Sequence, residues 1–361
     1  MKKDFNNKVL IAMSGGVDSS VAALLMVDQG YEVAGATLRL YDNKDITSKA
    51  CGQTADLEDA RKVAESLGFP HYSLDYREEF IAKVINKFAM TYEKGQTPNP
   101  CIDCNRYIKF AKLIDIAKEM GYDRIVTGHY AKVEYDEAKD RYLLRKSSDP
   151  KKDQTYVLYG LNQDQLSRVI FPMEGLNKDQ ARQLAEDGKL EVAHKKDSQD
   201  ICFIPDRDYE KYIREELNIN PGPGKFVDLE GNILGDHLGH THYTIGQRKG
   251  LGLALGKPAY VVAIDPKKNL VVIGEESDLY SKEALVNEVN LIYMESLDGP
   301  MEVKVKTRYS QLATDAIISP LADGKIKIQF KDKVRAVTPG QAAVFYLDDY
   351  VVGGGTIESA Q

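Results

Sequence analysis

Apolar positions in the N-terminal half of the chain follow two alternating spacings. Short runs rich in β-branched residues are separated by longer stretches in which apolar residues recur at every third or fourth position. The short runs predict buried strands, and the longer stretches predict helices with one apolar face. The expected strands are Lys8–Met13, Glu32–Leu40, His71–Leu74 and Arg124–Thr127, and the expected helices are Asp18–Gln29, Thr54–Leu67, Glu78–Tyr92 and Arg106–Met120. This alternation is typical of an α/β fold, a parallel sheet with crossover helices.

Residues suited to helix ends support these boundaries. Asp18 can cap the first helix, and Thr54 precedes the acidic residues of a first turn. Gly30, Gly68 and Gly121 stand just beyond predicted C-terminal ends. A polar side chain at the start accepts hydrogen bonds from unpaired N–H groups, and glycine readily takes the left-handed conformation that closes a helix.

The remainder of the chain has a different character. Residues 132–146 alternate as a β-hairpin does, and Asn177–Gly188 returns to helical spacing. After Asp206 glycine and proline become frequent, and from about Lys282 onward short alternating runs follow one another closely. These patterns predict a small central β-rich domain followed by a β-barrel or sandwich. We therefore expect three domains, residues 1–206, 207–280 and 281–361.

The composition fits a soluble protein. Apolar residues make up 43% and charged residues 29% of the 361 residues, and the formal net charge is -7. No apolar run approaches the ~20 residues that cross a bilayer, and the opening MKKDFNNKVL lacks the apolar core of a signal peptide, so we expect a cytoplasmic protein. Within residues 301–335, however, eight Lys and Arg residues stand against four Asp and Glu residues. This local surplus favours a polyanionic partner.

The stretch VLIAMSGGVDSS, residues 9–20, joins the first predicted strand to the first predicted helix. Its glycines and the helix start place several unpaired N–H groups around one concavity, which favours an anion. A common phosphate loop ends in Gly-Lys-Ser or Gly-Lys-Thr, whereas Asp18 and Ser19 occupy that place here. A carboxylate beside phosphates is explained by an intervening Mg²⁺ and a departing pyrophosphate. The alternative is a glycine turn in which Asp18 and Ser19 only cap the helix.

Three of the four cysteines form a pattern that suggests thiol or metal chemistry. Cys101 and Cys104 form a Cys-x-x-Cys pair after TPNP and before the fourth predicted helix, a position that lowers thiol pKa values. With the distant Cys202 they match sulfur transfer, redox chemistry or a three-cysteine iron–sulfur site, whereas a four-ligand zinc site would also need His129 or Cys51. Alternatively, Cys202 is a small buried apolar residue. We assign no role to Cys51.

Motifs along the whole chain resemble one family. The string SGGVDSS resembles the PP-loop of the ATP-pyrophosphatase superfamily, whose members split ATP into AMP and pyrophosphate while they adenylate a substrate. Six further runs resemble the bacterial and mitochondrial tRNA-specific 2-thiouridylases: TPNPCIDCNRYIKF, TGHYA, KDQTYVLY, DSQDICFIP, GQRKGLGLALG and VKTRYSQ. The resemblance implies a PP-loop α/β domain, a small central domain and a C-terminal β-barrel that binds tRNA.

The resemblance also implies a reaction. ATP, with Mg²⁺, would adenylate the 2-oxygen of the wobble uridine in tRNAs for Lys, Glu and Gln, and sulfur would then replace the activated oxygen as AMP leaves. Carried over by position, the ATP-binding residues are Ala12, Met13, Ser14, Gly15, Gly16, Val17, Asp18, Ser19, Leu38 and Gly128. The residues that would meet the target base are Pro98, Asn99 and Pro100, and those that would contact the rest of the tRNA are Lys152, Asp153, Gln154, Arg308 and Tyr309.

One position departs from the usual pattern of this family. Most members have Asp after Asn-Pro, where this chain has Cys101, and that carboxylate is a candidate general base near the uridine. Asp103 is a candidate substitute. The extra thiol creates the three-cysteine set of iron–sulfur-dependent tRNA thiolases, so we predict that Cys101, Cys104 and Cys202 hold a 4Fe-4S cluster whose open iron binds hydrosulfide.

The usual scheme of the family is the alternative to this cluster. There Cys202 would receive a persulfide from a cysteine desulfurase or relay protein, and Cys104 would release the sulfur by forming a disulfide. Free sulfide is a further candidate donor for the cluster route.

Two other functions would explain only some of these motifs. A PP-loop enzyme acting on a small acceptor, as argininosuccinate and NAD synthetases do, would leave the cysteines and the basic β-rich part without a role. A non-catalytic tRNA-binding or iron-storage protein would not need Asp18 in the loop. Release of AMP that depends on unmodified tRNA distinguishes the thiolase from both.

Overall fold

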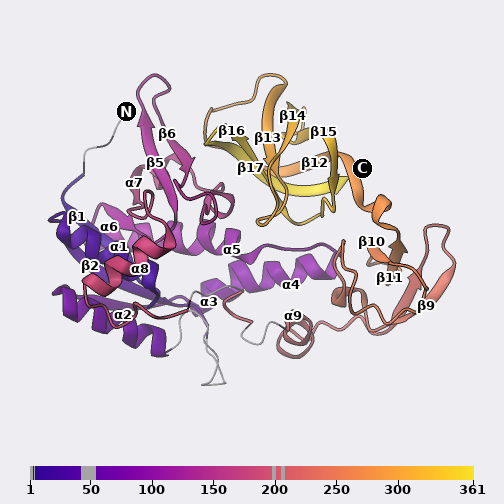
Figure 1. Ribbon diagram of the computed structural model, residues 1–361, viewed down its shortest axis with the longest axis horizontal. Coiled ribbons are helices and arrows are strands. Elements are labelled where there is room, and N and C mark those ends of the chain that lie inside the picture. Colours follow the sequence, from indigo (N-terminus) through magenta and orange to yellow (C-terminus); the bar gives the residue numbers. More distant parts are fainter. Residues whose placement is uncertain (1–2, 4, 42–53, 197–200, 205–207) are drawn as a thin grey trace.

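The N-terminal part is built on a parallel five-stranded sheet (Figure 1). The computed structural model describes residues 3, 5–41, 54–196, 201–204 and 208–361. The strand order is β3-β2-β1-β4-β7, with β1 Lys8–Ala12, β2 Glu32–Arg39, β3 His71–Asp75, β4 Arg124–Val126 and β7 Val169–Ile170. The four predicted strands are present, which confirms the α/β fold, and β7 extends the sheet beyond them.

Alternate residues of the central strand β1 face two different layers. Leu10 packs with Leu113 on one face, whereas Val9 and Ile11 pack on the other face with a layer of three helices. These helices are α1 (Val17–Asp28), α2 (Thr54–Leu67) and α8 (Lys178–Asp187). A parallel strand covered on both faces must be apolar throughout, which explains the uninterrupted run that predicted β1.

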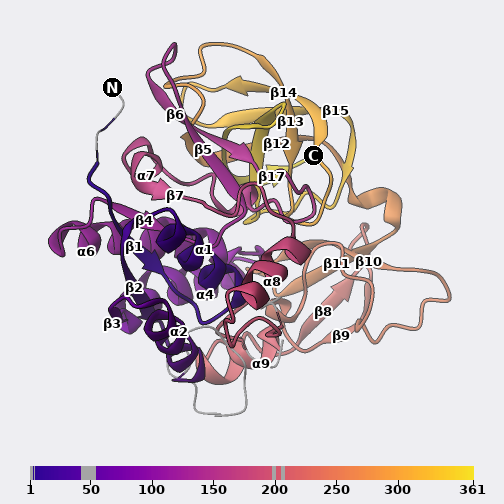
Figure 2. The same ribbon diagram turned by 60° about the vertical axis from the view of Figure 1, so that its left-hand side comes forward.

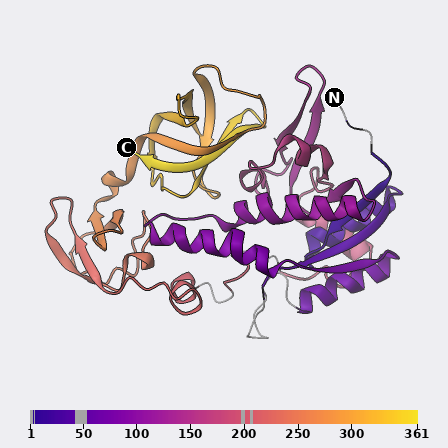
Figure 3. The ribbon, with the colours of Figure 1, turned by 180° about the vertical axis from the view of Figure 1, so that it is seen from behind.

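Two long helices follow the sheet strands, and the first of them reaches beneath the barrel whereas the second runs along the sheet region (Figure 3). The first consists of α3 (Arg77–Phe80), η1 (Ile81–Ile85) and α4 (Asn86–Glu93), and the second of α5 (Pro100–Asp103), η2 (Cys104–Lys112) and α6 (Leu113–Glu119), with η1 and η2 in π-helical geometry. The second helix begins at Pro100 and not near Arg106 as predicted. Proline suits the first helical position, where no N–H donor is needed, and Asn99 before it is extended. Cys101 therefore lies in the first turn of this helix, and Cys104 lies directly after that turn.

The central part contains a four-stranded sheet in the order β10-β11-β8-β9. Its strands are β8 Gly224–Val227, β9 Ile233–His237, β10 Tyr260–Asp265 and β11 Leu270–Gly274. The C-terminal part is a β-barrel, as predicted, because pairing of β12 with β17 closes its sheet. Its strands are β12 Tyr280–Leu291, β13 Met301–Lys306, β14 Thr314–Pro320, β15 Ile326–Arg335, β16 Ala342–Leu347 and β17 Tyr350–Ala360.

The predicted hairpin is confirmed, and it joins the barrel (Figure 2). It consists of β5 (Ala131–Asp136) and β6 (Arg141–Lys146), and Arg145 of β6 pairs with Tyr350 of β17. One apolar cluster contains Leu144 from the hairpin together with Val344 and Val351 from the barrel. The N-terminal part and the barrel thus share a core. The domain boundaries at residues 206 and 280 stay a prediction.

Short elements complete the described chain. They are η3 (Thr155–Val157), α7 (Gln163–Arg168), α9 (Tyr209–Lys211), η4 (Tyr212–Glu216), η5 (His240–His242) and η6 (Glu276–Leu279). The predicted helix Asn177–Gly188 is α8, and Asn177 caps it by accepting a hydrogen bond from the backbone N–H of Gln180 at 2.9 Å. Within the described residues, every helix is too short or too polar to span a bilayer.

Candidate active site

The loop between β1 and α1 is closely surrounded by backbone. Gly15 has φ +66°, and a Cβ atom there would lie 2.2 Å from the carbonyl oxygen of Asp56 in α2. From the other side, a Cβ atom at Gly128 would lie 2.7 Å from the backbone nitrogen of Ser19. Side chains at these two positions would push the three segments apart, so glycine is required at both. This packing fixes the start of α1, whose unpaired N–H groups point into the loop. Such a ring of N–H donors is suited to bind phosphate.

Polar side chains hold the loop from within. The Ser19 hydroxyl accepts from the backbone N–H of Ser14 at 3.2 Å and donates to the carbonyl of Gly16 at 3.1 Å. Asp18 Oδ1 accepts from the Tyr130 hydroxyl at 2.8 Å and from the Lys178 ammonium at 2.7 Å. The Asp18 side chain is 31% exposed at the mouth of α1. An oriented carboxylate beside a phosphate-binding loop is a suitable ligand for Mg²⁺.

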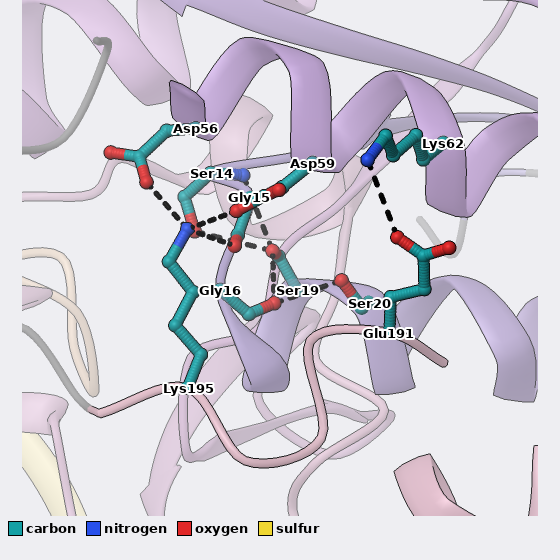
Figure 4. A network of polar contacts seen from close by, with 10 residues as sticks. All are labelled: Ser14, Gly15, Gly16, Ser19, Ser20, Asp56, Asp59, Lys62, Glu191 and Lys195. Atoms are coloured by element: carbon teal, nitrogen blue, oxygen red, sulfur yellow. Dashed lines mark hydrogen bonds and ion pairs between the residues drawn. The ribbon is translucent and has the colours of Figure 1, made fainter. Parts of the chain in front are cut away.

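A lysine from a distant segment joins this loop to α2 (Figure 4). Lys195 Nζ donates to the Gly15 carbonyl at 2.9 Å and to Asp56 and Asp59 at 2.6 Å each. Sequence reasoning missed these three contributors, Lys195, Asp56 and Asp59. The apolar periodicity of α2 gives no sign that its acidic first turn faces a lysine far along the chain.

The other residues expected beside the nucleotide lie at the same edge of the sheet, because the carboxyl ends of parallel strands meet there. Leu38 is near the end of β2 and is half-buried, and Gly128 follows β4. His129 comes next, with Nδ1 2.8 Å from the Thr127 hydroxyl oxygen. Burial, aided by the charge of Lys109, lowers the pKa of His129 to about 3. The imidazole is therefore neutral near pH 7 and can act only as a neutral hydrogen-bonding group.

Cys104 and Cys202 belong to one cluster of aromatic and aliphatic side chains. Cys104 is buried in the second long helix, and Cys202 is half-buried against the same cluster. Phe203, beside Cys202, packs its ring against that of Phe88 from the first long helix at a centroid distance of 5.4 Å. The Tyr41 hydroxyl donates to the Cys202 carbonyl at 2.6 Å, which fixes the backbone there. The fold therefore brings these two distant thiols to one region.

Cys101 has a different environment from Cys104. Its side chain reaches solvent, yet the surrounding protein raises the pKa of its thiol, because desolvation outweighs the opposing charge of Lys109. The expectation of a lowered pKa is therefore wrong for Cys101. Cys101 interacts electrostatically with Tyr309 from the barrel, whose pKa is raised mainly by burial and also by Asp153 and Cys101. Cys101 thus lies where the barrel approaches the Cys-x-x-Cys turn.

The three thiols are not grouped as a metal-ion site within the described residues. Among the residues that the structure describes, no three His, Cys, Asp or Glu side chains are grouped so that they can hold a metal ion. Cys101, Cys104 and Cys202 are all described, so the iron–sulfur prediction has no support from their positions. Cys51 lies outside the described residues.

Asp103, the candidate substitute for the missing carboxylate, is buried in an ion pair. Its Oδ1 lies 3.0 Å from Lys87 Nζ, and Lys87 also lies 3.4 Å from Glu288 of the barrel strand β12. Burial raises the pKa of Asp103, and Lys87 opposes this effect. The carboxylate thus links the Cys-x-x-Cys turn to the first long helix and the barrel, which favours a positioning role.

Two of the residues expected to contact tRNA, Asp153 and Gln154, instead make hydrogen bonds to other groups of this chain. The Asp153 carboxylate accepts from the Thr155 hydroxyl at 2.8 Å and is buried. Gln154 Oε1 accepts from the backbone N–H of Tyr130 at 2.9 Å. Lys152, which precedes them in the chain, is half-buried. In this structure Asp153 and Gln154 therefore fix the loop that carries Lys152.

The barrel meets this loop and the Pro98–Pro100 segment. Tyr309 is 44% exposed, and its hydroxyl lies 3.5 Å from the carbonyl oxygen of Asp153. Arg308 donates to the Ile245 carbonyl at 2.9 Å and to the Thr338 hydroxyl at 2.6 Å, which ties the barrel to the central part. Gln341 of the barrel donates to the Pro98 carbonyl at 3.1 Å. The expected target-base and tRNA segments thus converge around one edge of the barrel.

Comparison with known proteins gives a consistent relationship over nearly the whole chain. Three family profiles match: a "tRNA methyl transferase HUP domain" over residues 7–206, a "tRNA methyl transferase PRC-barrel domain" over 210–275 and an "Aminomethyltransferase beta-barrel domain" over 281–357. The tRNA-specific 2-thiouridylase MnmA of Acetivibrio thermocellus is 51% identical over 97% of this chain and 99% of its own length. The protein of the same name from Clostridium perfringens is 48% identical over 98% of both chains.

Solved structures resemble only part of the molecule. A 4-thiouridine synthetase in complex with RNA and ATP aligns with 55% of this chain and 45% of its own, at 18% identity and a TM-score of 0.37. The U34-tRNA thiolase NcsA from Methanococcus maripaludis, with its [4Fe-4S] cluster, aligns with 58% of this chain and 67% of its own, at 18% identity and a TM-score of 0.35. Likenesses at this level give no information about the site.

Proposed function

Because this chain belongs to the tRNA-specific 2-thiouridylase family, we propose that it is a sulfurtransferase that uses ATP to replace the 2-oxygen of a tRNA uridine with sulfur. One observation carries the proposal. Leu38, at the nucleotide edge of the sheet, also packs against the cluster that contains Cys104 and Cys202. An activated base and a sulfur-bearing thiol can therefore meet without a large movement of the sheet.

In the first step the chain binds and orients ATP. The N–H groups at the start of α1 face the triphosphate. Asp18, fixed by Tyr130 and Lys178, would hold Mg²⁺, which would neutralise charge on the departing pyrophosphate. The uridine 2-oxygen attacks the α-phosphorus, the bond to pyrophosphate breaks, and an adenylated uridine forms. Binding of the triphosphate through backbone N–H groups leaves the α-phosphorus accessible to the base.

In the second step sulfur is transferred through Cys202 and Cys104. Cys202 carries a persulfide supplied by a cysteine desulfurase or relay protein, and its terminal sulfur attacks the activated carbon, from which AMP leaves. The Cys104 thiolate then attacks the inner sulfur of Cys202, so a disulfide forms and the 2-thiouridine is released. A thiol reductant restores both thiols with two electrons. The proposed steps use only Cys202 and Cys104, and none of them passes through an iron–sulfur cluster.

The finer identity of the substrates follows the family. We propose the wobble uridine of the tRNAs for Lys, Glu and Gln as the target, with Pro98, Asn99 and Pro100 around the base. Lys152, Arg308 and Tyr309 are the proposed tRNA contacts. The reaction is expected in the cytoplasm, where these tRNAs are used.

The test uses the full chain with Mg-ATP, a persulfide donor and an unmodified tRNA transcript. AMP and pyrophosphate are separated by chromatography, and 2-thiouridine is quantified by mass spectrometry of nuclease digests. We expect AMP release only with tRNA, and none with a matched transcript that has cytidine at the wobble position. Cys202→Ser is expected to release pyrophosphate but no AMP, because AMP leaves only when the persulfide attacks. Cys104→Ser is expected to release AMP but to form no free 2-thiouridine, because the base stays bound to Cys202 through a disulfide. AMP formed without tRNA, in the presence of a small amine, would instead indicate an amide-forming ligase.

A further inference from the structure

Lys306, the last residue of β13, is half-buried on the outer face of the barrel. Its ammonium lies 5.9 Å from the ring centroid of Tyr156 and 5.4 Å from that of Tyr309. Burial lowers the pKa of Lys306, the charge of Lys146 lowers it further, and Asp153 opposes both. In the part of the chain that the structure describes, no carboxylate lies within ion-pair distance of Lys306. Two lysines are therefore held near each other without a close anion on Lys306.

Lys146 also lines a small hollow between the hairpin and the barrel. The hollow has a volume of about 120 Å³. It is lined by Lys132, Arg145, Lys146, Ser147, Ser148, Glu174 and Asp349. The acidic members contact the cations only at long range, since Lys132 lies 3.8 Å from Glu174 and Arg145 lies 3.5 Å from Asp349. Tight charge-assisted hydrogen bonds are about 2.7–2.9 Å long, so these cations keep bonding capacity for another anion.

The hollow and Lys306 are connected to the region that meets the target nucleotide. The backbone N–H of Ser147 donates to the buried carboxylate of Asp153 at 3.4 Å, and the carbonyl of Asp153 faces the Tyr309 hydroxyl. Lys146 connects the hollow to Lys306, because it lines the hollow and its positive charge repels that of Lys306. The positive charges thus continue from Tyr309 along the seam between barrel and hairpin.

We infer that Lys132, Arg145, Lys146 and Lys306 form a phosphate track that binds consecutive backbone phosphates of the tRNA next to the target uridine. This inference rests on the proposed function for the identity of the polyanion. Ammonium and guanidinium groups match phosphate oxygens in charge and geometry, and the hydroxyl groups of Ser147 and Ser148 add uncharged donors. The partly exposed ring of Tyr309 offers a stacking surface at one end of the track.

The test measures tRNA affinity by fluorescence anisotropy at several KCl concentrations. Each phosphate contact that is lost should lower the slope of log affinity against log salt by about 0.7–0.9. We expect this change for Lys306→Gln and for Lys146→Gln, with three- to tenfold weaker binding at low salt, about the size that the loss of one such contact gives. Lys304→Gln is the matched control, because Lys304 is on the same strand and its ammonium is paired with Asp315 at 2.9 Å. It should leave the slope unchanged.

Slopes of Lys306→Gln and Lys146→Gln equal to that of the wild type would overturn the phosphate track. Lys306→Arg, which keeps the charge, should retain the wild-type slope. If Lys306→Gln does not fold, Lys132→Gln and Arg145→Gln test the same track, since these side chains are 36% and 39% exposed. A failure of the proposed function would give a different result from a failure of the phosphate track, because the wild-type protein would then neither bind tRNA nor form 2-thiouridine.

Discussion

The ammonium group of Lys195 lies 2.9 Å from the carbonyl oxygen of Gly15, which is 180 residues earlier in the chain. Its remaining donors reach Asp56 and Asp59. A lysine has three N–H donors, so all of them are used to hold the nucleotide loop against the start of α2. In the sequence, Lys195 stands seven residues before Cys202.

Replacing Lys195 should weaken ATP binding. Lys195→Met removes the donor that fixes Gly15, and we expect about tenfold lower ATP affinity, or about 1.4 kcal/mol. The measurement is titration of the tRNA-free protein with ATP by calorimetry. Lys62→Met is a suitable control, because its ion pair with Glu191 is exposed, with side chains 47% and 74% accessible. Equal ATP affinities of Lys195→Met and the wild type would contradict the clamp.

The two glycines of the loop should respond differently to alanine. Gly15→Ala would place Cβ 2.2 Å from the Asp56 carbonyl oxygen at φ +66°, so the loop must move, and we expect the free energy of unfolding to fall by about 3 kcal/mol or more. Gly16→Ala would meet only the Ser14 hydroxyl, at 3.4 Å. Its free energy of unfolding should change by less than about 1 kcal/mol. Denaturant titration of both variants checks this, and similar losses would contradict it.

Stability should increase with pH because of His129. The pKa of its imidazole is about 3 in the folded protein and about 6.5 when unfolded, so between these values only the unfolded chain binds the proton. This difference adds a slope of about 1.4 kcal/mol per pH unit, with stability present above pH 6.5 and lost as the pH falls toward 3. Urea titrations from pH 4.5 to 7.5 measure the slope. His129→Gln should flatten it, and an unchanged slope would exclude His129 as its source.

Asp103 and Lys87 should be energetically coupled. Lys87→Met leaves the buried Asp103 carboxylate without its cation, and we expect a loss of about 2 kcal/mol, less than for a fully buried pair because Lys87 is 36% exposed. In Lys87→Met/Asp103→Asn the buried charge is absent, so the double variant should be more stable than the sum of the single effects predicts. Strict additivity in a denaturant-based mutant cycle would contradict the coupling.

Cys101 should be dispensable for sulfur transfer. The proposed steps use only Cys202 and Cys104, so Cys101→Ser is expected to retain most of the rate of 2-thiouridine formation. The rate is measured with anaerobically purified protein, together with its iron and labile sulfide content. Loss of activity in Cys101→Ser, combined with about four irons per chain in the wild type, would favour the three-cysteine cluster instead.

Local patterns predicted the sheet and its loop well. The apolar run Val9–Ile11 identified the central strand because both of its faces are covered, and Gly15 and Asp18 identified the turn at which β1 leads into α1. By contrast, the helix start at Pro100 was missed because a proline after Asn99 is equally typical of a turn. The motif correctly placed the Cys-x-x-Cys pair near a helix start, but that start lies at Pro100 and not near Arg106.

The spacing of apolar residues predicts helices and strands, but it does not predict which distant segments contact each other. Lys195 and Asp56 are polar residues at element ends, and their sequence neighbours do not indicate that they meet. The same is true of Arg145 and Tyr350, since a hairpin can be predicted without its third strand. The roles of Asp153 and Asp103 also needed the structure, because burial decides whether a carboxylate binds a ligand or supports its own chain.

The pairing of β6 with β17, and the apolar cluster that contains both Leu144 and Val351, have a consequence for how the molecule comes apart. Each of the two regions, the first two hundred or so residues and the barrel, would lose part of its hydrophobic core if it were separated from the other. We therefore expect these two regions to melt in a single cooperative transition, and fragments cut near residue 206 to be prone to aggregation, because each would expose an apolar surface and an unpaired strand edge.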